Sequence, residues 1–242
     1  MIGFMKKTLI RENDIEEYIN SWKKNNAHEQ DGRYASFDYC FNYFQDFRVN
    51  GNIKDIVSLQ KLQLSCLHLG FYLASWGMYR GSSSILQHSC HFLEKPLKVI
   101  AERDEKFWKI DVDEYTEDNI KLLVKCGEEI REKLKNAYGK ISDTLVTKIM
   151  LGVFGNVPAY DTYFLKTMRE KIGGTFNRES LEKIGKFYKL NKGVIKKLCK
   201  QTKTIDFLNS SKTDRHYTKA KIIDMYGFQK GYELDKKNEN KH

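Results

Sequence analysis

The chain has 242 residues, 31% of them charged, and a formal net charge of +10. A chain of this length can bury a core without covalent staples, and its five cysteines include no C-x-x-C pair, which argues against a disulfide scaffold and a structural zinc ribbon. No stretch is apolar for long enough to span a membrane, and residues 1–10 lack the apolar run of a signal peptide. We therefore expect a cytoplasmic protein without a membrane partner.

The positive charge is concentrated in the last quarter of the sequence. Residues 181–242 contain 16 Lys and Arg against 7 Asp and Glu, so they carry +9 of the total charge of +10. This gradient indicates a polyanion as partner, because neutralising each phosphate releases counterions and strengthens binding. A solvated lysine surface without a ligand is the alternative.

The first part of the chain reads as a series of helices. Pro96 and Pro158 are the only prolines, and such scarcity favours an all-α class. We expect helices over 15–22, in an aromatic-rich block at 34–47, and over 53–78. The apolar residues of 53–78 are too dense for a surface helix, so this segment is predicted to be the central buried one.

Helices are also expected along the rest of the chain, with turns at glycine and proline. Their predicted ranges are 82–101, 116–138, 143–154, 162–172, 179–190, 192–201 and 214–226. We see no internal repeat and no linker. The prediction is therefore a single compact helical domain over 1–235, compatible with two helical layers and a cleft between them, with basic C-terminal helices in 179–226 and a disordered tail at 236–242.

The most informative segment is 144–164, TLVTKIMLGVFGNVPAYDTYF. An apolar helix runs into a glycine and a proline, and Asp161 then opens the next helix. An aspartate in this place can simply cap the helix by accepting hydrogen bonds from free backbone amides. Alternatively, it can present a carboxylate to a cleft.

This segment resembles the signature of the helix-hairpin-helix DNA glycosylase superfamily, in which an apolar helix, a Gly-x-Pro turn and an aspartate follow one another. The matching residues are Ile149–Gly152, Phe154–Gly155, Pro158 and Asp161–Phe164. The resemblance implies that Asp161 is catalytic: it would stabilise positive charge on the deoxyribose as the base leaves, or help to position the attacking water. The likeness is confined to 144–164.

Three departures from that signature narrow the expected chemistry. The hairpin should fall near 139–143, but it lacks most of the glycines that let backbone amides approach a phosphate. Leu145 stands where bifunctional members carry their Schiff-base lysine, and Lys148 follows one helical turn later, so a monofunctional enzyme is expected. Cys199 is the only cysteine after Cys126, which leaves no iron–sulfur spacing and no expected cofactor.

A glycosylase must hold a flipped base against apolar or aromatic side chains and read its edge with hydrogen bonds. The end of the predicted helix 53–78 offers Trp76, Tyr79 and Arg80 for such a pocket. The turn before Asp161 offers Asn156 and Tyr160. For Trp76 and Tyr79 the alternative is a place in the core, and Arg80 could instead contact a phosphate.

Lysines recur at three- and four-residue steps along 179–203, whereas the apolar residues between them can face inward. Such a stripe suits the backbone of a duplex better than base reading, because lysine is a flexible point charge. The predicted nucleic-acid contacts are Lys140, Lys148, Lys186, Lys189, Lys192, Lys196, Lys197 and Lys200.

Other chemistries lack a signature in the sequence. His88, Cys90 and His91 are closely spaced, but nothing elsewhere completes a metal site, so no metal is expected. Walker loops, dinucleotide glycines, nucleophile elbows and H-E-x-x-H motifs are all missing.

The resulting hypothesis is a DNA-binding, glycosylase-like hydrolase that cleaves the N-glycosidic bond of a damaged or modified base. The hypothesis extends to a role in defence against phage that carry modified DNA. A non-enzymatic nucleic-acid-binding protein is one alternative. A helical ribonuclease-type toxin or defence effector is another. Against the toxin, Arg80 and His88 have seven residues between them, more than the short Arg-x4–6-His signature allows.

Overall fold

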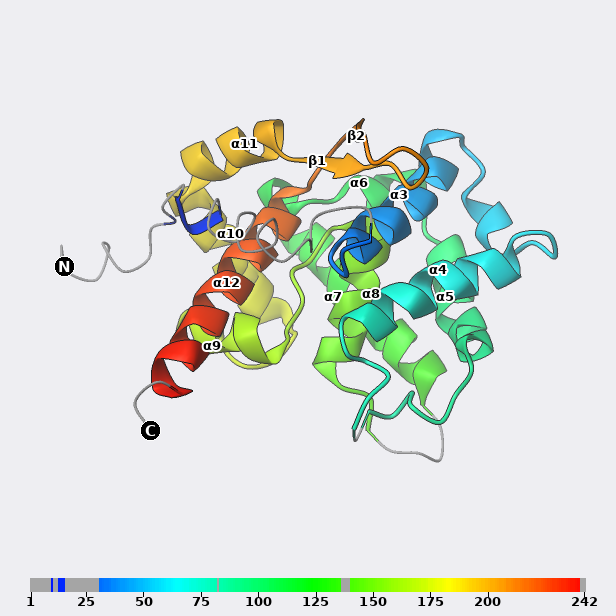
Figure 1. The fold of residues 1–242 in the computed structure, drawn as a ribbon, viewed down its shortest axis with the longest axis horizontal. Coiled ribbons are helices and arrows are strands. Elements are labelled where there is room, and N and C mark those ends of the chain that lie inside the picture. Colours follow the sequence, from blue (N-terminus) through cyan, green and yellow to red (C-terminus); the bar gives the residue numbers. More distant parts are fainter. Residues whose placement is uncertain (1–9, 11–12, 16–30, 82, 136–139, 240–242) are drawn as a thin grey trace.

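A computed structural model describes residues 10, 13–15, 31–81, 83–135 and 140–239. It confirms the all-α class, since one small two-stranded sheet is the only sheet found in these ranges (Figure 1). Nearly all of the helix predicted at 15–22 lies outside the described residues. No helix in the described ranges combines the length and the apolar character needed to cross a membrane.

Four helices in the second half of the chain begin and end within one residue of their predicted bounds. The side chains of Ser142, Asp161 and Asn177 each accept a hydrogen bond from the backbone amide three residues later, which starts a helix. Gly155 ends the first of the four with a φ of 67°, a conformation that glycine adopts without strain. The four are α8 (Asp143–Phe154), α9 (Thr162–Ile172), α10 (Arg178–Leu190) and α11 (Lys192–Gln201).

The first half of the chain is more broken than predicted. Segment 53–78 splits because Ser58 is extended, and in 82–101 the helix starts late because Ser89 is extended too. The elements are α3 (Ala35–Val49), η1 (Ile53–Val57), α4 (Leu62–Ser75), η2 (Cys90–Leu93), α5 (Glu94–Ala101), α6 (Glu105–Lys109), η3 (Val112–Glu114) and α7 (Glu117–Leu134).

After α11 the chain forms a hairpin that the sequence did not predict. Strands β1 (Lys203–Ile205) and β2 (Lys212–His216) pair antiparallel, and Asp206 fixes the turn by accepting hydrogen bonds from two following amides. The helix predicted at 214–226 is therefore wrong in its first residues. Helix α12 (Lys219–Glu239) also continues past the predicted start of a disordered tail at 236, helped by the ammonium of Lys236, which lies 4.8 Å from the Tyr232 ring centroid.

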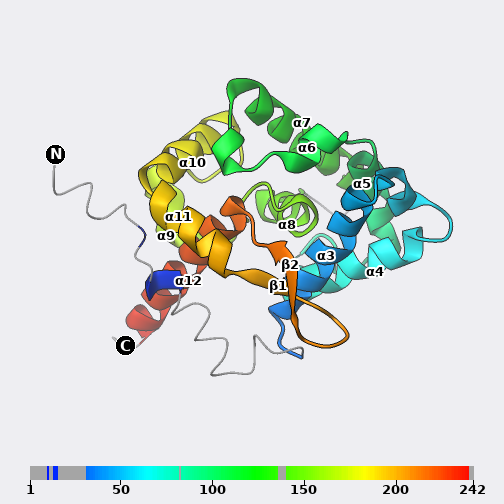
Figure 2. The same ribbon diagram turned by 90° about the horizontal axis from the view of Figure 1, so that it is seen from above.

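Helix α8 lies at the centre of the fold, surrounded by the other helices (Figure 2). Gly152 permits this position, because a Cβ there would lie 2.4 Å from the Tyr72 ring of α4. The prediction that 53–78 holds the central helix is wrong: α4 packs one side against the core and exposes the side with Leu64, Leu67 and Phe71.

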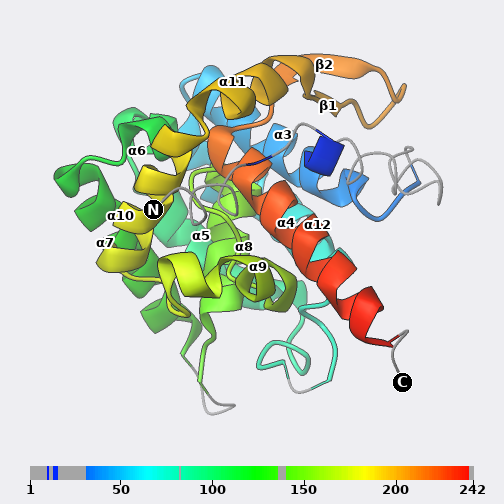
Figure 3. The ribbon, with the colours of Figure 1, turned by 90° about the vertical axis from the view of Figure 1, so that its left-hand side faces the viewer.

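Helices α9 and α12 pack side by side over much of their length (Figures 1 and 3). Two glycines one turn apart on α12 make the approach possible. A Cβ on Gly227 would lie 2.4 Å from the Phe164 ring, and one on Gly231 would lie 1.9 Å from the Tyr163 carbonyl oxygen. This contact holds the first turn of α9, where Asp161 lies, against the middle of α12.

Candidate functional site

The loop between α8 and α9 is held by one face of α8. The Thr144 hydroxyl donates to the Tyr160 carbonyl at 2.8 Å, and the Tyr160 amide donates to the Thr147 hydroxyl at 2.9 Å. From the other side, the Ala159 amide donates to the Asp224 carboxylate of α12 at 3.0 Å. The backbone just before Asp161 is therefore fixed by side chains from two helices.

Both carboxylate oxygens of Asp161 have donors. Its Oδ1 accepts from the Phe164 amide at 2.9 Å, and its Oδ2 lies 3.0 Å from the Lys148 ammonium. The Lys148 side chain is 4% exposed and that of Asp161 13% exposed. Helix capping is therefore part of what Asp161 does, and a buried ion pair with Lys148 is added to it.

The Trp76 ring lies among three cationic groups. The ammonium groups of Lys148 and Lys221 are 5.0 and 5.2 Å from its centroid, and the Arg33 guanidinium is 5.5 Å away. These distances are within the range of cation–π attraction. The indole Nε1 is buried and has no hydrogen-bond acceptor among the described residues.

Asp161, Lys148 and Trp76 share a pocket of about 340 Å³, which we call the Asp161 pocket. It combines aromatic surface with three basic groups and two carboxylates. The residues that line it are Arg33, Trp76, Gly77, Met78, Arg80, Thr144, Lys148, Asp161, Thr162, Tyr163, Phe228 and Asp235. Its volume falls in the range of about 300 to 1,000 Å³ that is usual for small-ligand sites.

The structure brings together only part of the predicted pocket. Trp76 and Arg80 line it with Asp161, whereas Tyr79, Asn156 and Tyr160 are not among its lining residues. Tyr160 points into the core, where its hydroxyl lies 2.7 Å from Ser180 Oγ. Alternation along the extended loop explains this, since the neighbour of an outward-facing aspartate faces inward.

Asn156 and Tyr79 also lie outside the lining of the pocket. Asn156 is fully buried, and its amide has no hydrogen-bond partner among the described side chains and backbone groups. The backbone carbonyl of Asn156 accepts a hydrogen bond from the Tyr115 hydroxyl at 2.6 Å. Tyr79 is half-buried, and burial raises the pKa of its hydroxyl to about 12. Both residues contribute to packing around the loops.

The predicted basic contacts divide into two groups. Lys148 is buried against Asp161 and is therefore not part of an exposed stripe. The others are exposed: Lys140 before α8, Lys186 and Lys189 on α10, and Lys192, Lys196, Lys197 and Lys200 on α11.

Two of these lysines line a pocket of their own. Lys196 and Lys200 are at the wall of a pocket of about 370 Å³ with Cys199, His216 and Lys219. None of the described residues of α10 or α11 lines the Asp161 pocket. Asp161 and the lysines of α10 and α11 therefore do not line one pocket.

Sequence reasoning missed several lining residues. Thr144 and Lys148 lie one turn apart on the face of α8 that meets the loop, a spacing that could have signalled a shared role. Arg33 precedes α3, Tyr163 belongs to α9 and Phe228 to α12, so no local sequence pattern connects these three lining residues.

The segment expected to hold the hairpin is only partly described, since 136–139 lie outside the described residues. Leu145, which stands at the position of the Schiff-base lysine in the resemblance, is fully buried in the core. A lysine amine is nevertheless present in the Asp161 pocket, supplied by Lys148.

Metal-ligating side chains do not gather in the part of the chain that the structure describes: it contains no group of three or more His, Cys, Asp or Glu with suitable geometry. His91 instead pairs with Glu94 at 3.2 Å.

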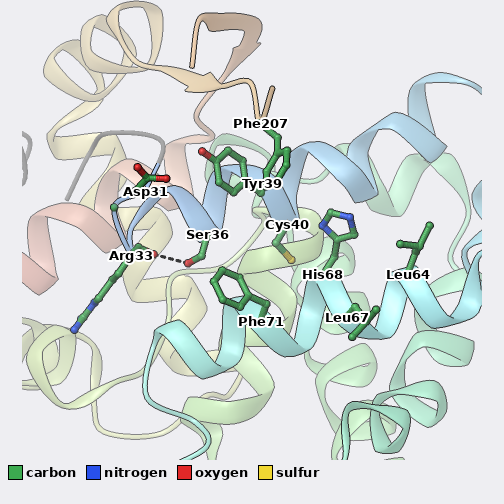
Figure 4. Close-up of a pocket in the computed structure, with 11 residues that line it drawn as sticks. Asp31, Arg33, Ser36, Tyr39, Cys40, Leu64, Leu67, His68, Phe71 and Phe207 are labelled. Atoms are coloured by element: carbon green, nitrogen blue, oxygen red, sulfur yellow. Dashed lines mark hydrogen bonds between the residues drawn. The ribbon is translucent and has the colours of Figure 1, made fainter. Parts of the chain in front are cut away.

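A second, more apolar pocket of about 440 Å³ lies between α3 and α4 (Figure 4). The Phe207 ring from the β1–β2 turn packs edge-on against Tyr39 at 4.9 Å, and His68 and Phe71 face them from α4. Arg33 contributes to this pocket as well, but its side chain points away from the aromatic rings. No carboxylate–lysine pair lies among its lining residues.

Comparisons of the chain with protein-family models, with curated proteins and with solved structures found no match.

Proposed function

We propose that this protein binds DNA and hydrolyses the N-glycosidic bond of a damaged or modified base that is flipped into the Asp161 pocket. The observation that carries the proposal is the Asp161 carboxylate, which is fixed by a backbone amide and a buried lysine at the wall of a pocket with aromatic surface. A fixed carboxylate is what this reaction needs, because positive charge develops on the sugar as the base departs.

Asp161 has acceptor capacity left for the substrate. A carboxylate has about four lone-pair sites. Of these, the Phe164 amide and the Lys148 ammonium use two. The remaining capacity could orient a water molecule or face the sugar, while the two donors hold the group in place without cost at the moment of reaction.

The other lining groups suit a nucleotide. The Trp76, Tyr163 and Phe228 rings provide apolar surface for a base outside the stack. The guanidinium groups of Arg33 and Arg80 are exposed at the same pocket and can pair with the flanking phosphates.

The test is base release from a panel of duplexes. The full-length protein is incubated with normal, damaged and hypermodified DNA and with RNA, and abasic sites are then detected by cleavage in alkali. Asp161→Asn keeps the capping oxygen but removes the charge, and it should reduce base release at least about 100-fold while DNA binding is retained. Asp118→Asn, an exposed aspartate in the first turn of α7, is the matched control and should keep full activity.

Borohydride trapping distinguishes water from a lysine as nucleophile. With water as nucleophile, no covalent protein–DNA adduct forms. An adduct that is lost in Lys148→Met would instead assign the attack to the Lys148 amine. DNA binding without base release on any duplex would contradict the proposal in favour of a non-enzymatic binding protein, and cleavage of RNA would favour the toxin.

The exposed lysines of α11 should contribute to DNA affinity through the backbone. Replacing Lys192, Lys196 and Lys200 with glutamine should weaken binding to every duplex alike, and the slope of log K against log salt should shrink by about 0.9 per lost phosphate contact. The control has as many substitutions at exposed lysines of α5 and α7: Lys98, Lys121 and Lys125. Equal effects of the two triple variants would contradict a role for the α11 face.

A further inference from the structure

Two arginines that are far apart in the sequence lie near each other at the end of α3. Arg48 is in the last turn of α3, and Arg215 is on β2. Both line a pocket of about 380 Å³ and a neighbouring one of about 480 Å³, so they form the boundary between the two.

Arg48 has a positive charge that no described carboxylate balances by direct contact. Its Nε donates to Gln45 Oε1 at 2.8 Å, and no Asp or Glu oxygen among the described residues lies within 4.0 Å of its guanidinium. Burial, together with the charge of Arg215, lowers the pKa of Arg48, and the carboxylate of Glu105 opposes this only in part. A half-buried guanidinium beside a second one is destabilising unless an anion joins them.

Arg215 is held in position by three hydrogen bonds. Its guanidinium donates to the Asn42 carbonyl and side chain at 3.1 and 3.0 Å, and to the Asp46 carboxylate at 2.7 Å. Asp46 is 63% exposed, so this pair is open to solvent. Gln45, the partner of Arg48, is itself fixed by a hydrogen bond to the Val153 carbonyl at 2.9 Å. Both guanidiniums are therefore positioned before any ligand arrives.

Two of the three acidic side chains that line the 380 Å³ pocket are engaged by groups other than the two arginines. Asp111 accepts from the backbone amides of Lys219 and Ala220, and Asp113 pairs with the Lys219 ammonium at 3.3 Å. Glu114 is the remaining acid among the residues that line the 380 Å³ pocket. Asp111 and Asp113 therefore do not pair with the two arginines. In the 480 Å³ pocket Asp214 pairs with Lys203 at 3.2 Å, and Asp46 is the one carboxylate among the described residues in direct contact with either arginine.

More basic side chains lie between the two arginines and α11. The 380 Å³ pocket shares Asp113, His216 and Lys219 with the pocket that Lys196 and Lys200 line. The shared lining residues make these hollows neighbours along one surface. Arginine forks match the geometry of phosphate oxygens, whereas lysines follow a backbone less specifically.

We infer that Arg48 and Arg215 bind a phosphate group, and that this phosphate belongs to a nucleic-acid backbone that also passes the lysines of α11. The site is separate from the Asp161 pocket and does not depend on base release, so it can fail or hold independently of the proposed glycosylase activity.

The test uses the full chain, inorganic phosphate and a short DNA duplex, with chloride as the control at equal ionic strength. Titration calorimetry should show phosphate binding that Arg48→Gln weakens roughly tenfold, because one charge-assisted pair of hydrogen bonds is lost. Duplex affinity should fall as well, with a salt slope smaller by about one phosphate contact. Arg48→Lys should restore the salt slope but only part of the phosphate affinity.

Arg178→Gln is the matched control, since its guanidinium is exposed and pairs with Glu117 and Glu182 on other helical surface. Arg178→Gln should leave the affinities for phosphate and for the duplex unchanged. Circular dichroism checks that Arg48→Gln is folded. Loss of phosphate binding with unchanged duplex affinity would keep the site and assign it to a free anion. No phosphate binding, or equal effects of Arg48→Gln and Arg178→Gln, would overturn the inference.

Discussion

Two buried lysine–carboxylate pairs flank the same tryptophan, and they differ in what they face. Lys148 and Asp161 are 3.0 Å apart, and Lys221 and Asp224 are 2.9 Å apart. Their ammonium groups lie at nearly equal distances from the Trp76 centroid, 5.0 and 5.2 Å. The first pair lines the Asp161 pocket, whereas the second does not and is 3% and 7% exposed.

The two ion pairs differ in role: one supports the structure, and the other is a candidate for the chemistry. Asp224 uses one oxygen for Lys221 and the other for the Ala159 amide, so it holds the loop that leads to Asp161. Asp161 uses its two oxygens similarly, but it does so at a surface that a ligand can reach. The same kind of pair thus serves as a positioning element in the interior and as a candidate reacting group at the pocket.

The largest expected effect is on the interior pair. Asp224→Asn keeps an acceptor for the Ala159 amide but leaves the buried Lys221 ammonium without its hydrogen-bonded counter-charge. The free energy of unfolding should fall by about 3 kcal/mol or more, measured by urea denaturation. The double variant Lys221→Met with Asp224→Asn should recover much of this loss, because no buried charge remains. Additive losses in the double variant would mean that the two residues act independently.

A third carboxylate beside this interior pair should respond to pH. Burial raises the pKa of Asp38 to about 7, although the Tyr217 hydroxyl and the Ile205 amide donate to it. A carboxyl group whose pKa is raised on folding stabilises the protein below its unfolded pKa, and this contribution is lost as the pH rises through about 7.

Unfolding free energies measured between about pH 5 and pH 8 should therefore decline in the wild type, with a slope of up to about 1.4 kcal/mol per pH unit for one proton. Asp38→Asn should flatten that decline. If Asp38→Asn and the wild type show the same slope, Asp38 is ionised in the folded state throughout this pH range.

The sequence predicts elements well where the signal is local. The bounds of α8 and α9 follow from Ser142, Gly155 and Asp161, each of which acts on backbone groups within a few residues. The β1–β2 hairpin was missed because its strands are short and its turn depends on one aspartate. The central position of α8 depends on the fit of Gly152 against Tyr72, which only the tertiary structure reveals.

In the candidate site, too, the residues with a local sequence signal could be predicted, and those that depend on tertiary contacts could not. Asp161 could be selected from the pattern around it, and Trp76 and Arg80 from the polar end of an apolar segment. The ion pair with Lys148 joins residues 13 positions apart, across a turn of the chain. A lysine predicted to contact nucleic acid is therefore buried. Tyr160 was placed in the pocket because it adjoins Asp161, but extended backbone turns adjacent side chains to opposite sides.

The smallest effect on stability is expected at Asp161, despite its similar ion pair. Asparagine caps helices as well as aspartate does, and in Asp161→Asn the Lys148 ammonium can be hydrated through the pocket. We expect a loss of about 1 to 2 kcal/mol, smaller than for Asp224→Asn, because Asp161 is 13% exposed at the pocket. Asp161→Ala also removes the acceptor for the Phe164 amide and should cost about 1 kcal/mol more.

Urea denaturation of these variants beside Asp224→Asn decides whether the two pairs really differ. If Asp161→Asn destabilises the protein as much as Asp224→Asn does, water does not reach Lys148 when its partner is neutral. A pocket that cannot hydrate an ammonium group cannot admit the attacking water either. The carboxylate would then be a structural cap with a structural counter-ion, and the enzymatic proposal would lose its physical basis even before any base release is measured.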